Sequence, residues 1–196
     1  MDGLFFIWCS WIVIIYVLFF AYSNRKLVLV HILLIVFLSQ FLFQYDEWTI
    51  NSSIIYLFVI AIVYTAHQAV NERMRIYAVS FILAILQASY YLFYILEPLW
   101  FLWIPSWVNH FLLVYVCTLL IQQNGNRILS LIMGKIISDV LIFVVHLQNN
   151  LQYEILQLAW LDQVAMVLVL LFIWSIMESV GKYILNHSRH TQKKEV

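Results

Sequence analysis

The chain has 196 residues, of which 65% are hydrophobic and only 10% are charged, with 10 Lys and Arg against 10 Asp and Glu. A soluble domain is excluded, because globular chains are roughly half apolar and about one quarter charged, and a disordered chain is excluded because it needs low hydrophobicity. The balanced charge offers no basic surplus for nucleic acid. We therefore expect a protein whose main partner is the lipid bilayer.

Seven apolar stretches follow one another along the chain, each near the roughly 20 residues that a helix needs to cross a bilayer. Their predicted bounds are 4–22, 27–45, 54–70, 76–96, 105–121, 128–147 and 160–180. The gaps are short and polar, so residues 1–181 are predicted to form one all-α membrane domain of seven helices. Gly181 is expected to end the last helix, which leaves residues 182–196 as a short cytoplasmic tail. The first stretch lacks the basic start of a signal peptide, so it should remain as a membrane helix.

The fifth stretch has two interpretations. Glu97 precedes Pro98, and a residue before proline is pushed out of the helical region, so the fourth helix should end there. Residues 98–104 are rich in aromatic side chains and fit a short interfacial segment, with Pro105 opening the fifth helix. Alternatively, one kinked helix runs from Pro98 to Ile121.

Alternate gaps carry the basic residues. One side of the predicted bundle holds Arg25, Lys26, Arg73, Arg75, Arg127, Lys182, Arg189, Lys193 and Lys194. The other side holds Asp2, Asp46, Glu47, Glu97 and Glu154. Because Lys and Arg near the ends of spans stay in the cytoplasm, this asymmetry predicts an odd number of crossings, with the N-terminus outside and the C-terminus inside.

Three of the predicted helices carry small residues at four-residue spacing, which places them on one helix face. The triplets are Ala61, Thr65 and Ala69; Ser80, Ala84 and Ala88; and Ser130, Gly134 and Ser138. Close approach at small residues drives helix association in lipid. We therefore expect the helices at 54–70, 76–96 and 128–147 to form the tight centre, with the other four toward lipid.

The helix at 128–147 also carries the polar residues that could have a functional role. Lys135, Asp139 and His146 fall within about 40° of one another around the helix axis. A charge inside the membrane normally faces the bundle interior and has a partner. Lys135 and Asp139 can pair with each other, and Gln87 on the helix at 76–96 could hydrogen-bond to Asp139.

This stripe has a functional and a structural interpretation. The functional one is a path for a proton or an ion. The structural one is a local ion pair, with Lys135 and His146 reaching toward the two interfaces. The sequence predicts no catalytic residue, cofactor or metal site. Cys9 and Cys117 lie inside apolar runs and are expected to be buried thiols.

The opening segment Leu4-Phe5-Phe6-Ile7-Trp8-Cys9-Ser10-Trp11, with Phe19-Phe20 after it, resembles the start of YphA-type proteins. These are small multi-pass membrane proteins of endospore-forming Bacillus relatives, and the chain length and span density are also similar. The resemblance implies a bacterial cell-membrane protein with a link to the spore envelope. It implies no reaction, so no catalytic residue is carried over.

The sequence is compatible with two functions. The leading hypothesis is a non-enzymatic membrane component that binds a partner protein or a second copy, or helps assemble the cell envelope. The alternative is a small transporter or proton-coupled permease that uses Asp139, Lys135 and Gln87.

Overall fold

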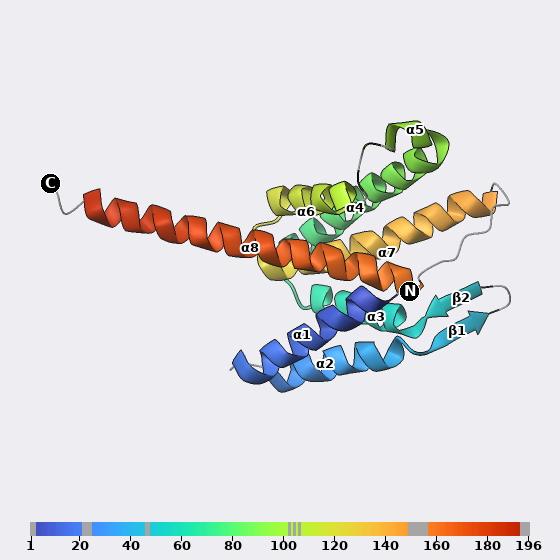
Figure 1. Ribbon diagram of the computed structural model, residues 1–196, viewed down its shortest axis with the longest axis horizontal. Helices are drawn as coiled ribbons and strands as arrows, with labels where there is room; N and C mark the ends of the chain where they lie inside the picture. Colours follow the sequence, from blue (N-terminus) through green and yellow to red (C-terminus); the bar gives the residue numbers. More distant parts are fainter. Residues whose placement is uncertain are drawn as a thin grey trace.

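The computed structural model describes residues 3–20, 25–45, 48–101, 103, 105, 107–148 and 157–192 (Figure 1). Within these residues the chain forms helices joined by short connections, with one β-hairpin after the second helix. The elements are α1 (Leu4–Phe20), α2 (Arg25–Leu38), β1 (Leu42–Tyr45), β2 (Trp48–Asn51), α3 (Ser52–Ala66), α4 (Val70–Leu96), α5 (Pro98–Phe101), α6 (Trp107–Leu120), α7 (Asn124–Gln148) and α8 (Leu158–Gln192).

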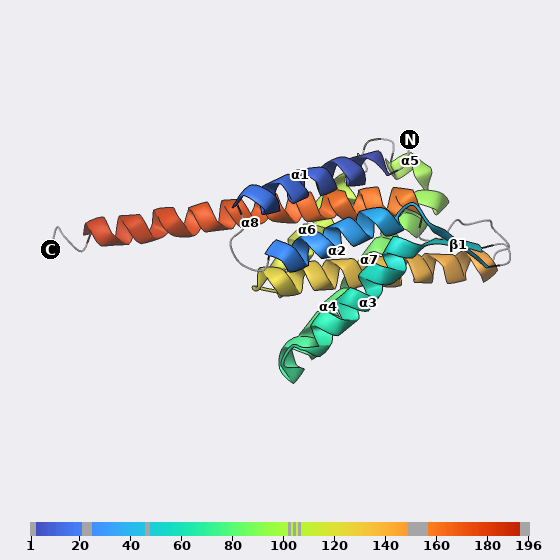
Figure 2. The same cartoon turned by 90° about the horizontal axis from the view of Figure 1, so that it is seen from below.

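Helix α7 lies at the centre of the bundle. It contacts α3, α4, α6 and α8, whereas α1 and α2 pack against each other and join the rest of the bundle through α8 and α3 (Figures 1 and 2). The side chains of α7 that are buried include both apolar residues and all three polar residues predicted as a stripe. The three polar residues of the stripe therefore lie on α7, which is the most buried of the candidate spans.

Three helices in the described part of the chain are long and apolar enough to cross a membrane. They are α4, α7 and the Leu158–Ile184 part of α8. Helices α1, α3 and α6 are apolar but shorter, at 17, 15 and 14 residues, and α2 has 14 residues. The predicted helical membrane fold is confirmed in this coarse form, while the seven crossings and their direction stay predictions.

The β-hairpin corrects the predicted second helix, which extended from residue 27 to residue 45. Helix α2 ends at Leu38, and β1 pairs antiparallel with β2 so that Leu42 faces Asn51. The Asn51 side chain fixes this change of direction. Its amide donates a 2.9 Å hydrogen bond to the Ser39 carbonyl, and its Oδ1 accepts from the Ser53 backbone nitrogen at 3.0 Å. Asn51 thus joins the end of α2 to the start of α3 as an N-cap.

Two more predicted boundaries are settled by the structure. Helix α5 is a short element of its own, separate from α6, as in the interpretation with an interfacial segment. Helix α8 continues through Gly181 to Gln192, so the predicted end at Gly181 is wrong. Glycine weakens a helix without ending it unless a left-handed cap forms, and Gly181 lies inside regular helix with open space around it.

The small residues of α4 and α7 face each other, as predicted. A Cβ added to Gly134 would lie only 3.0 Å from the Ser80 carbonyl oxygen and 3.0 Å from the Leu83 Cβ, so the two backbones are nearly in contact. Helix α3 contributes Ala61 and Thr65 to the buried region, whereas Ala69 is exposed. The centre predicted from small residues is therefore confirmed for α4 and α7 and holds in part for α3.

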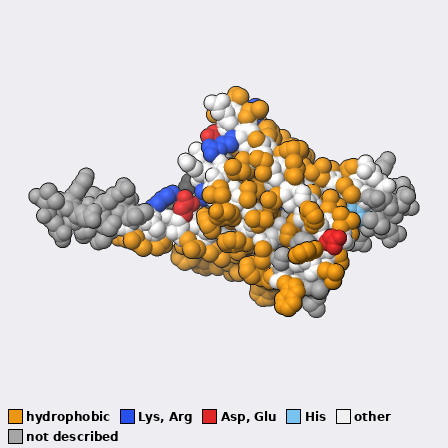
Figure 3. All heavy atoms as spheres, turned by 90° about the horizontal axis from the view of Figure 1, so that it is seen from above, with side chains coloured by type: hydrophobic (Ala, Val, Ile, Leu, Met, Phe, Trp, Pro, Cys, Tyr) orange, Lys and Arg blue, Asp and Glu red, His pale blue; other side chains and the backbone are white. Residues whose placement is uncertain are grey.

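The expectation that α6 and α8 lie toward lipid holds only in part, because each has an exposed apolar face and also contributes to the buried core. One buried cluster joins residues of α4, α6, α7 and α8, including Leu83, Leu113, Cys117 and Val167. A second joins α3, α4, α7 and α8 around Trp160. Bulky side chains fill the spaces between these helices, so size alone did not mark a lipid-facing helix. Hydrophobic side chains still cover most of the face shown in Figure 3.

Candidate functional site

The polar stripe of α7 lies inside the bundle. Lys135, Asp139 and His146 are exposed by only 4%, 8% and 6%, respectively. Their shared helix face results from the four-residue and seven-residue spacings, and the neighbours of α7 cover that face. Each of these side chains must therefore find its partners within the protein.

Lys135 is held by a residue that the sequence analysis missed. Its ammonium donates a 2.8 Å hydrogen bond to Oε1 of Gln163 on α8, and it also interacts electrostatically with Asp139 one turn away. Gln163 is itself exposed, so it links the buried ammonium to the surface of the bundle. No charge marks Gln163 in the sequence; its only signal was a polar residue inside an apolar run.

The outer part of the stripe contacts α4. The rings of His146 and Tyr91 pack with centroids 5.8 Å apart. Gln87, one turn before Tyr91, was predicted to hydrogen-bond to Asp139. In the structure its Oε1 accepts a 3.2 Å hydrogen bond from the amide of Asn109 on α6. Hydrogen bonds between polar side chains thus join α7 to α8 and α4 to α6.

A second carboxylate, that of Asp162 on α8, accepts hydrogen bonds from the backbone at the start of α1. Asp162 Oδ2 accepts a 2.7 Å hydrogen bond from the Gly3 backbone nitrogen, and Oδ1 accepts a 2.8 Å bond from the Phe6 backbone nitrogen. The first amides of a helix have no partner within the helix, and they favour negative charge. Asp162 therefore caps α1 from α8, which the sequence could not reveal because its partners are backbone groups.

Basic side chains gather at the opposite end of the bundle, where they bind carbonyls at the ends of neighbouring helices. Arg75 donates to the Leu120 carbonyl, and Arg73 donates to the Ala66 carbonyl at 2.9 Å. Arg127 donates to the Ile121 carbonyl at 2.6 Å and forms a 2.9 Å ion pair with Glu178. Cations complement the negative end of a helix. Side chains predicted from charge to set orientation therefore also complete helix ends.

The chemistry of this arrangement is that of interhelical pairing. In the part of the chain that the structure describes, no three His, Cys, Asp or Glu side chains converge as they would around a metal ion. Cys117 is buried against the Arg127 carbonyl, with its sulfur 3.6 Å from that oxygen. Lys135, Asp139 and His146 are the ionisable groups of the stripe, and each is enclosed by neighbouring helices.

Comparison with known proteins gives one match. A family described as YphA-like integral membrane protein matches residues 2–196, which is nearly the full length of the chain. No curated protein matches the sequence, and no solved structure matches the fold.

Proposed function

Because the chain belongs to the YphA-like integral membrane protein family, we propose that it is a non-enzymatic structural or assembly component of the bacterial cell membrane. In this role it holds a partner membrane protein, or a second copy of itself, within the cell or spore envelope. The observation that carries the proposal is the hydrogen bond from Lys135 to Gln163. This bond uses a buried charge to join two helices of the same chain.

The other buried polar groups support the same role. Gln87 bonds to Asn109, Asp162 caps α1, and Asn51 joins α2 to α3. Hydrogen bonds between membrane helices stabilise a defined arrangement, because the alternative is a polar group in hydrocarbon. A chain whose interior polar groups bond helices to one another is suited to present a fixed outer surface to a partner.

We also propose that seven helices cross the membrane, with the amino-terminal end outside the cell and the carboxyl-terminal end in the cytoplasm. The support is the position of Arg25, Arg73, Arg75 and Arg127 near the starts of α2, α4 and α7, at the same end of the bundle as the part of α8 that holds Glu178 and Lys182. To test the orientation, a reporter that works only in the cytoplasm is fused after Val196, and we expect it to give a signal. Activity of a reporter that works only outside the cell would refute this orientation.

The structural role is tested by replacing Asp139 with Asn, which keeps the size of the side chain and removes its charge. Loss of the charge beside Lys135 should lower the thermal unfolding temperature in detergent and the amount of protein in the membrane. The matched control is Glu97→Gln, on an exposed residue at the outer end of α4. Unchanged stability in the Asp139 variant would contradict the proposal.

One observation favours a second candidate, a small transporter or proton-coupled permease. The exposed Gln163 connects the buried Lys135 to the bundle surface, and Asp139 and His146 continue the series of ionisable groups. In vesicles with an imposed pH gradient and an internal pH dye, this candidate predicts proton entry that Asp139→Asn abolishes while stability is kept. The structural role predicts that vesicles with the protein and vesicles without it acidify at the same rate.

A further inference from the structure

Helices α1, α2 and α3 lie next to one another and are all short, whereas on the other side of the bundle the 14-residue α6 lies between the long helices α4 and α8. Helices α1, α2 and α3, here called the short side, have 17, 14 and 15 residues. At 1.5 Å per residue they are about 25, 21 and 22 Å long, whereas the hydrocarbon core of a typical bilayer is about 30 Å thick. The candidate spans in α4, α7 and α8 have 25 to 27 residues and reach about 37–40 Å.

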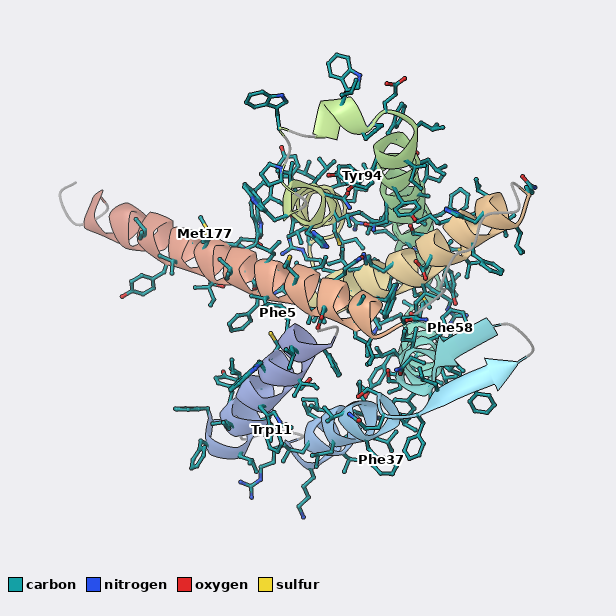
Figure 4. The ribbon with its side chains drawn as sticks, turned by 45° about the vertical axis from the view of Figure 1, so that its right-hand side comes forward. Phe5, Trp11, Phe37, Phe58, Tyr94 and Met177 are labelled. Atoms are coloured by element: carbon teal, nitrogen blue, oxygen red, sulfur yellow. The ribbon has the colours of Figure 1, made fainter. Side chains whose placement is uncertain are left out.

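Helix α2 is the part of the short side that faces lipid most fully. None of its residues is buried, and Val30, Leu33 and Phe37 are all exposed (Phe37 is labelled in Figure 4). Its inner end begins with Arg25 and Lys26, whose charges belong in the headgroup layer. Long basic side chains can extend that end by a few ångströms. The remaining shortfall must be met at the outer end.

The outer end of the short side cannot extend into hydrocarbon. The chain turns there from α2 into the β-hairpin, which projects from the bundle as Figures 1 and 2 show. Strands β1 and β2 pair only with each other among the described residues, so each has an edge that no other strand covers. Open sheet edges do not occur in the hydrocarbon layer, because their backbone groups need water or protein partners.

The start of the hairpin fits the headgroup layer instead. Phe41, Leu42 and Phe43 are exposed, and aromatic side chains favour the membrane–water interface. Asn51 bonds the hairpin to Ser39 at the end of α2, so the hairpin cannot slide along the helix. Hydrocarbon beside α2 must therefore end near Ser39.

We propose that the short side thins the bilayer next to it by about 5–9 Å and recruits phospholipids with short acyl chains. A helix shorter than the hydrocarbon thickness is matched by local thinning, and tilting would only shorten its reach. The occupant of this surface is thus lipid of reduced thickness. The inference rests on the proposed crossing of the membrane by α1, α2 and α3 and on their lengths, and it holds for a structural component and for a transporter alike.

The test compares two lipid-facing positions of the full-length protein. Leu33, near the middle of α2, is 51% exposed, and Ile173, near the middle of the α8 span, is 48% exposed. Each is replaced by cysteine (Leu33→Cys, Ile173→Cys) after Cys9 and Cys117 are changed to alanine, and a fluorescent label is attached. The proteins are reconstituted in vesicles of phosphatidylcholine with 14-carbon and 22-carbon chains, in which either lipid in turn is brominated to quench the label.

We expect the ratio of quenching by short-chain to quenching by long-chain lipid to be at least threefold higher at position 33 than at position 173. Equal ratios at the two positions would overturn the proposal. Weak quenching by both lipids at position 33, with disulfide crosslinks between copies, would also overturn it, because a second copy would then cover the short side. If Leu33→Cys does not fold, Val30→Cys and Phe172→Cys supply a second pair, exposed by 58% and 61% in the wild type.

Discussion

The carboxylate of Asp162 lies 2.7 Å from the backbone nitrogen of Gly3, although the two residues are 159 positions apart in the sequence. With its second oxygen on the Phe6 nitrogen, Asp162 performs both tasks that a capping box divides between two residues. The start of α1 is therefore attached to the start of α8, so the first and last long helices of the chain lie in contact.

Replacing Asp162 should loosen α1. Asp162→Ala removes both acceptors and should cost about 1–2 kcal/mol of stability, whereas Asp162→Asn keeps one oxygen and should cost less. Hydrogen–deuterium exchange at the first turn of α1 should accelerate in the same order. Glu97→Ala, on an exposed residue at the same end of the bundle, serves as the control. Unchanged exchange in α1 would show that the cap contributes nothing.

Gly134→Leu should separate α4 from α7. Its side chain would meet the Ser80 carbonyl and Leu83, which lie at the limit of contact for even a methyl group. Overpacking of this kind costs about 1–3 kcal/mol, and close helix approach is lost with it. Thermal unfolding in detergent measures the effect. Gly125→Leu is a matched control, because nothing lies within 4 Å of a Cβ at Gly125. Equal losses in the two variants would refute the close contact.

The contact between Lys135 and Gln163 can be measured with a double-mutant cycle of Lys135→Met and Gln163→Leu. Hydrogen bonds between membrane helices contribute about 0.5–2 kcal/mol, so we expect a coupling free energy in that range from reversible unfolding. Lys135→Met alone should destabilise more than Gln163→Leu, because it also leaves Asp139 without its cationic neighbour. Lys182→Met, at a lysine whose side chain is 72% exposed, should change stability little. Additive effects of the two central substitutions would contradict the contact.

Asn51→Ala should be among the most destabilising single changes. It removes the bond to Ser39 and both bonds from Ser53, and it leaves buried partners unsatisfied. Each unsatisfied buried group costs about 1–3 kcal/mol. Ser53→Ala removes only one of these bonds and should cost less. The exposed Asn71 supplies the control Asn71→Ala, which should melt like the wild type. If Asn51→Ala had the same melting temperature as the wild type, the anchoring role would be refuted.

Hydropathy predicted where the long helices lie because their apolar residues repeat over many turns. Helices α4 and α7 fall within a few residues of the predicted stretches at 76–96 and 128–147. The hairpin was missed because β1 continues the apolar run of α2, and a short apolar strand has no pattern that separates it from a helix end. The sequence did offer one signal of the hairpin, the polar Asn51 between two apolar stretches. The structure shows this residue to be fully buried.

The candidate site was predicted in part for a similar reason. Lys135, Asp139 and His146 are conspicuous in an apolar helix, so helical geometry sufficed to place them on one face. The partners could not be predicted, because Gln163 meets Lys135, and Asn109 meets Gln87, only after helices distant in sequence pack together. The predicted bond of Gln87 to Asp139 chose the right pair of helices, while the structure shows Gln87 bonded to α6.

The central place of α7 has a consequence for how the protein is made. Ribosomes deliver α3, α4 and α6 before α7, yet these helices direct their buried faces toward α7. Until Asn124 and the residues after it leave the translocon, Ser80 and the other small residues of α4 have no helix against which to pack. A nascent chain that stops before α7 is therefore expected to depend on an insertion chaperone or to be degraded by membrane proteases. Supplying α7 and α8 as a separate fragment should rescue it.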